Sequence, residues 1–150
     1  MKLLALIDSN VVVAAVAPTH EHHLPSLAVI NSVETGALAV AERSFAEAYA
    51  VLTRRGDRPP FGFSSSDAWT ALESVRAVTV LVGLTANQTI DAVRDYARTG
   101  GIGLRLYDKL IGEAAVIHAI PTILTWNVGH MGSLFPGLRV TTPTAFDTSR

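Results

Sequence analysis

The 150-residue chain contains no cysteine. Disulfide bridges, thiolate zinc sites and cysteine nucleophiles are therefore excluded, and the chain is compatible with a reducing compartment such as the cytoplasm. Charged residues are also scarce, at 17% of the chain, and the formal net charge is -1. A protein that binds nucleic acid through a broad basic face would carry a clear positive net charge, so a nucleic-acid-binding protein of this kind is disfavoured. An enzyme that meets phosphate through a bound metal ion remains compatible with this balance.

No uninterrupted apolar run is long enough to cross a membrane. The first run, Leu3–Ile7, stands where the apolar part of a signal peptide would stand, but Asp8 interrupts it, which favours a buried strand. Hydrophobic residues nevertheless make up 49% of the chain, so a real core is expected and disorder is disfavoured. Because no repeat, linker or low-complexity segment is present, residues 1–150 are expected to form a single domain.

Short apolar runs alternate with segments in which apolar residues recur at the helical period. The runs predict strands at residues 3–7, 37–41, 78–82 and 121–126, with a further candidate at 138–141. The periodic segments predict helices at residues 11–17, from Pro25 to Gly36, at 44–55, after Ser64, from the capping-box pattern Thr85–Gln88 to Gly100, and from Asp108 onward. This order predicts an α/β fold with a central parallel sheet of four to five strands and helices on both faces.

Four polar residues stand at the ends of these runs or on the polar edge of a helix, namely Asp8, Glu47, Asp108 and Asn127. Asp8 follows the first strand and Asn127 follows the fourth, so in a parallel sheet both emerge at the carboxyl edge, where open α/β sheets bind ligands. Clustered carboxylates repel one another unless a cation lies between them, and a hard divalent cation is the usual solution. The sequence therefore predicts a Mg²⁺ or Mn²⁺ site at this edge.

The segments around these residues resemble a known family. They are Asp8-Ser9-Asn10-Val11, the segment 42–54 that contains Glu47, Gly100–Gly103 followed by Tyr107–Ile111, and Thr125–Met131. In this order they resemble PIN-domain ribonucleases, and most closely the VapC toxins of bacterial type II toxin–antitoxin systems. The resemblance implies a PIN-like domain and a metal-dependent endoribonuclease. It also implies that Asp8, Glu47 and Asp108 form the acidic metal site, with Asn127 at a fourth position that is often Asp.

The residue types suit phosphodiester hydrolysis, which needs an activated water and stabilisation of charge on the phosphate. In this interpretation Asp8 and Asp108 bind the ion directly, while Glu47 binds it or positions the attacking water. Thr125 and Ser9 are candidates for supporting these side chains, and Asn10 is expected to cap the short helix after the first strand. Whether one or two ions bind stays open, because Asn127 offers a neutral oxygen.

The resemblance also implies partners: an RNA substrate, a VapB-like antitoxin and a second copy of the chain in a homodimer, in the cytoplasm and without a membrane. Two alternatives stay open, a PIN-type RNA-processing nuclease without an antitoxin and a non-catalytic binding module whose acidic residues only cap helices. A haloacid-dehalogenase-like phosphatase is disfavoured, because the second aspartate that it usually needs is replaced by Asn10.

Several other polar residues allow both a functional and a plain interpretation. The loop with His20, His22 and His23 is either a metal clip or, as the missing fourth ligand favours, a solvated loop. His118 falls on the apolar face of the last long helix and is expected to be a packed histidine. The candidates for contact with RNA are His130 near the expected active edge and Arg105 and Lys109 on either side of Asp108.

Overall fold

The computed structural model describes residues 2–147. Their strands are β1 (Ala5–Ile7), β2 (Leu38–Ala41), β3 (Val80–Val82), β4 (Thr122–Leu124) and β5 (Arg139–Thr141). Their helices are α1 (Ser9–Val16), α2 (His23–Asn31), α3 (Glu42–Thr53), α4 (Ser65–Arg76), α5 (Ala86–Arg98), α6 (Arg105–Ile117) and α7 (Val128–Leu134). Each strand and helix expected from the sequence is present, with its ends shifted by a few residues.

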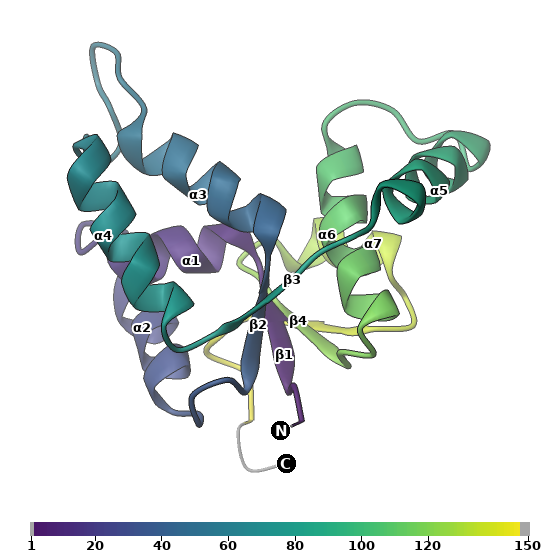
Figure 1. The fold of residues 1–150 in the computed structure, drawn as a ribbon, viewed down its shortest axis with the longest axis horizontal. Coiled ribbons are helices and arrows are strands. Elements are labelled where there is room, and N and C mark those ends of the chain that lie inside the picture. Colours follow the sequence, from purple (N-terminus) through teal and green to yellow (C-terminus); the bar gives the residue numbers. More distant parts are fainter. Residues whose placement is uncertain (1, 148–150) are drawn as a thin grey trace.

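The strands form one parallel sheet in the order β3-β2-β1-β4-β5, which confirms the predicted α/β fold (Figure 1). Leu6 at the centre pairs with Ala39 on one side and Ile123 on the other. The chain adds β2 and β3 on one side of β1 and then returns to place β4 and β5 on the other side. The direction of winding therefore reverses between β1 and β4, at the point where such sheets bind ligands.

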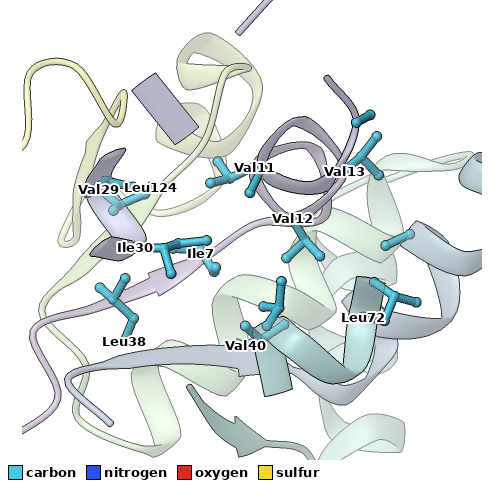
Figure 2. Packing of buried hydrophobic residues seen from close by; sticks show 14 of the residues in the cluster. Ile7, Val11, Val12, Val13, Val29, Ile30, Leu38, Val40, Leu72 and Leu124 are labelled. Carbon is cyan, nitrogen blue, oxygen red and sulfur yellow. The ribbon is translucent and has the colours of Figure 1, made fainter. Parts of the chain in front are cut away.

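Both faces of the sheet are covered, by α1 to α4 on one side and by α5 to α7 on the other (Figure 1). Alternate strand residues enter separate cores, so Ile7 and Val40 pack with the first helices while Leu6 and Ala39 face the later ones. Figure 2 shows Ile7 and Val40 among the valines of α1. The central strands β1, β2 and β4 are buried throughout and need continuous apolar runs, whereas Val80 and Leu81 of the edge strand β3 are exposed.

Three local features differ from the sequence-based expectations. Helix α6 begins at Arg105, so Asp108 lies in its first turn and does not open the helix. The cap of α1 is Asp8, whose side chain accepts from the backbone N–H of Ser9, and not Asn10. Helix α5 has the predicted capping box, but its expected inward residues Ile90 and Val93 are exposed.

The apolar segments are all short. In the part of the chain that the structure describes, no helix combines the length and the apolar character that crossing a membrane requires.

Candidate active site

Asp8 lies directly after β1 at the carboxyl edge of the sheet, and its side chain is buried, with 5% exposed. Its Oδ1 accepts a hydrogen bond of 2.7 Å from the backbone N–H of Ser9, which satisfies a free donor at the start of α1. Its Oδ2 accepts from the Thr125 hydroxyl at 2.9 Å. Asp8 thus joins α1 to the end of β4, and both of its oxygens are held in place.

The Thr125 hydroxyl lies at the centre of a small polar network. It accepts from the Asn10 amide at 3.0 Å and from the backbone N–H of Asn127 at 3.0 Å. Since these two donors occupy its lone pairs, its single proton is directed to Asp8. The support of Asp8 by Thr125 that the sequence indicated is therefore present.

Asn10 has a role that the sequence interpretation missed. Its amide donates to Thr125, and its Oδ1 accepts from the backbone N–H of Trp126 at 3.1 Å. The Asn10 side chain therefore joins the start of α1 to the segment after β4, where the direction of winding reverses, and fixes the backbone of that segment. The sequence carries no local signal for this role, because the two partners lie 115 and 116 positions away along the chain.

The charges of Asp108 and Glu47 act on the Asp8 carboxyl group at this edge. Burial raises the pKa of Asp8 to about 6, against the hydrogen bonds from Thr125 and Ser9, and the charges of Asp108 and Glu47 raise it further. Burial also raises the pKa of Asp108, while the positive charges of His130 and Arg105 act in the opposite direction. The structure thus brings Asp8, Glu47 and Asp108 within electrostatic reach, with His130 beside Asp108.

The fourth predicted residue, Asn127, is the N-cap residue of α7, but its side chain makes no capping hydrogen bond. It is exposed and follows Thr125 and Trp126 at the same edge of the sheet. The Asn127 side-chain oxygen is therefore not used to cap α7.

The donors at this edge suit a hard divalent cation, because they are carboxylate and amide oxygens around a buried acidic group. Within residues 2–147, no ion pair neutralises Asp8. As the side chains stand, however, no three acidic or histidine residues among those described converge closely enough to bind one ion together. The negative charge at this edge matches a cation. The acidic side chains would have to rotate before several of them could bind the same ion.

The raised pKa of Asp8 makes stability depend on pH. The unfolded chain releases this proton near 3.8 and the folded chain near 6, so between these values the folded state holds more protons and loses stability as the pH rises. In the presence of a chelator, we expect the free energy of unfolding to fall by roughly 3 kcal/mol across this window. Urea denaturation at several pH values measures this decrease. The same pH dependence of stability in Asp8→Asn would contradict its assignment to Asp8.

The histidine loop packs onto the site and does not form a metal clip. His22 stacks on Trp126, with ring centres 3.9 Å apart and an angle of 10° between the planes, and His20 stacks on Phe61. The His23 Nδ1 lies 2.8 Å from the carbonyl oxygen of Ala14. Each ring thus has a structural contact.

Helix α6 carries two of the remaining candidates, Arg105 and Lys109, and ends next to the third, His118. Lys109 is paired with Glu113 at 3.2 Å, so its charge is already compensated, whereas Arg105 is exposed beside Asp108. His118 is exposed at the end of α6, with Nε2 3.0 Å from the carbonyl oxygen of Gly83, so the expectation of a packed histidine was wrong. Helix α6 ends at Ile117, and His118 is the residue that follows as its C-cap.

Comparison with solved structures finds the same fold in bacterial proteins. VapC20 of Mycobacterium tuberculosis, described as a toxin that cleaves the sarcin–ricin loop, has a TM-score of 0.69 and 14% identity over 90% of this chain and 98% of that one. FitAcB of Neisseria gonorrhoeae has a TM-score of 0.63 and 16% identity over 95% and 100% of the two chains. VapBC2 of Rickettsia felis, bound to a DNA fragment of its promoter, has 0.62 and 15% over 92% and 97%.

Sequence comparison gives the family more directly. No curated protein matches the chain. The family model described as PIN domain, in contrast, matches residues 5–127. This range begins in β1 and ends at Asn127, and it includes Asp8, Glu47 and Asp108. Since the match covers most of the 150 residues, the chain belongs to the PIN-domain family.

Proposed function

We propose that this chain is a Mg²⁺- or Mn²⁺-dependent endoribonuclease and the toxin of a VapBC-type toxin–antitoxin pair that acts in the cytoplasm. The observation that carries the proposal is the buried Asp8 carboxylate, held by Thr125 at the reversal point of the sheet and facing the charges of Glu47 and Asp108. The fold similarity to VapC20 and to VapBC2 supports the toxin assignment. The whole of residues 1–150 would then act as one PIN domain.

The proposed roles rest on the residue types found at this edge of the sheet. Asp8 and Asp108 hold the cation, Glu47 holds it or orients the attacking water, and Asn127 contributes a neutral oxygen. When bound, Mg²⁺ or Mn²⁺ supplies a water of lowered pKa and positive charge for the scissile phosphate. Thr125 keeps one Asp8 oxygen in a fixed direction, and Arg105 and His130 contribute positive charge for the RNA backbone.

Two surfaces support the proposed protein partners. A groove of about 490 Å³ between α3, α4 and β3 is lined by Tyr49, Trp69 and Leu81, of which Trp69 is 59% exposed. An apolar segment of a VapB-like antitoxin fits this groove, since large exposed apolar patches mark interaction sites. The exposed Ile90 and Val93 of α5 support a homodimer in the same way.

Titration with Mn²⁺ tests the proposed metal site. We expect Mn²⁺ to raise the melting temperature of the parent protein at pH 7.5, because binding to the folded state alone stabilises it. Asp8→Asn should lose this shift, and Asn127→Asp should bind Mn²⁺ about tenfold more tightly, because it replaces a neutral ligand by a charged one. Weaker binding by Asn127→Asp would place this residue away from the ion.

The same samples then decide between the proposed enzyme and its alternatives. Cleavage of RNA by the parent in Mn²⁺, and none by Asp8→Asn, supports the nuclease. If neither stabilisation nor cleavage occurs, the chain is a binding module whose acidic residues cap helices. A small antitoxin-like reading frame beside the gene separates a toxin from an RNA-processing PIN nuclease.

A further inference from the structure

A second cavity, of about 340 Å³, lies between α3, α5 and α6 at the carboxyl ends of β2 and β3. In Figure 1 these ends lie between α3 on one side and α6 on the other. Its apolar wall includes Ala46, Leu84 and Ile111, and its polar groups are Glu42, Arg43 and Thr89. The volume is sufficient for one nucleobase, and the mixture of an apolar wall with few polar groups is typical of ligand sites.

The cavity adjoins the candidate active site. Arg43 precedes Glu47 by four residues on α3, which is about 6 Å along the helix axis. Ile111 follows Asp108 by three residues on α6. A strand with its phosphate at the carboxylates would therefore place a neighbouring nucleotide at the mouth of this cavity.

The Glu42 carboxylate lies against Gly83 in the cavity wall. A Cβ at Gly83 would lie 2.6 Å from Glu42 Oε1, closer than such atoms approach, so the carboxylate occupies space that only glycine leaves open. Across residues 2–147, no cation is paired with Glu42. Its oxygens are therefore available to accept hydrogen bonds from a ligand.

Arg43 provides the complementary group. Its guanidinium lies over the ring of Tyr107, 4.9 Å from the ring centre, and Tyr107 directly precedes Asp108. This contact positions the guanidinium group of Arg43. Unlike an ion pair with a carboxylate, it does not use the N–H groups as donors. None of the acidic side chains in the described part of the chain pairs with Arg43.

We propose that this cavity binds one guanine base of the RNA, splayed out beside the scissile phosphate, with Glu42 and Arg43 reading its edges. Guanine offers N1–H and N2–H to a carboxylate and O6 and N7 to a guanidinium. Adenine has one amino group and no O6, so it cannot satisfy both side chains as well. Bases of single-stranded RNA are read in this way, on their edges and in pockets. The role of the base rests on the nuclease function proposed above, but its binding can be measured without cleavage.

The test is an NMR titration of the metal-free protein with guanosine, inosine and adenosine 5′-monophosphates. We expect guanosine monophosphate to shift the amide signals of Gly83, Thr89 and Ala114 and to bind about tenfold more tightly than adenosine monophosphate. Inosine monophosphate lacks the N2 amino group and should bind with intermediate affinity. Equal affinity for the guanosine and adenosine nucleotides would overturn the proposal, as would shifts confined to the α3–α4 groove.

Substitutions separate the carboxylate's role from general charge effects. Glu42→Gln should weaken guanosine monophosphate binding about tenfold, and Gly83→Ala should weaken it by displacing the carboxylate. Glu34→Gln removes an exposed charge in the loop before β2 and should bind like the parent. Unchanged binding by Glu42→Gln overturns the proposal. Binding of guanosine monophosphate by a protein that cleaves no RNA in Mn²⁺ would count against the nuclease and leave the guanine cavity standing.

Discussion

Asp8→Asn is expected to reduce RNA cleavage at least about a thousandfold while the protein stays folded. The substitution keeps one oxygen that can accept from Thr125 and gives up the hydrogen bond from the Ser9 N–H, and it removes the charge that a divalent cation requires. Loss of buried charge should also make the metal-free protein more stable above pH 6, because ionised Asp8 is unfavourable in its buried position. Single-turnover cleavage and urea denaturation measure the two effects.

The matched control is Asp57→Asn, which removes an exposed charge from the loop after α3. It should retain the parent's cleavage rate and stability within experimental error, since exposed charges contribute little. Cleavage by Asp8→Asn at the rate of this control would show that the acidic edge is not the active site. Unfolding of Asp8→Asn would contradict the structure, in which the carboxylate is a destabilising group.

Gly112→Ala is expected to destabilise the protein by about 2 kcal/mol, although the residue lies inside helix α6. Alanine normally stabilises a helix by about 1 kcal/mol relative to glycine. Here the added Cβ would overlap the ring of Phe135, which is buried at the end of α7. Overpacking of this kind forces a shift of the helix or of the ring and outweighs the gain in propensity. The midpoint of urea denaturation measures the result.

Gly132→Ala provides the opposite control. Gly132 lies in α7, and a Cβ at this position meets no atom within 4 Å. Its substitution should raise stability by up to about 1 kcal/mol. Equal behaviour of the two alanine variants would show that α6 and α7 do not pack as described.

The sheet could be predicted from the sequence because its central strands β1, β2 and β4 are buried on both faces. Continuous apolar runs such as Leu3–Ile7 leave few alternatives to a strand, and the polar residues that end them mark the carboxyl edge. The predicted support of Asp8 by Thr125 is confirmed by a hydrogen bond of 2.9 Å. The metal-binding roles of Asp8, Glu47, Asp108 and Asn127 stay predictions.

The errors arose where the helical period alone could not show which face a helix buries. Ile90 and Val93 of α5 follow the expected period, but they are exposed. The only buried residue of α5 is Ala92, because the helix packs through the face that carries Ala92. Asn10 was assigned to its own helix because capping is a local interaction, whereas its partners lie in Thr125 and Trp126. Contacts between distant segments leave no mark in a local pattern.

The hydrogen bond between Asp8 and Thr125 joins residues 117 positions apart. A chain made from its N-terminus therefore contains all three acidic residues before the strand that supports Asp8 has been synthesised. Contacts of such large separation are slow to form, because closing a long loop costs entropy before the contact stabilises the chain. A fragment that stops short of Thr122 carries the carboxylates without the network that orients them. The candidate site can therefore be assembled only after the chain has been synthesised through Thr125.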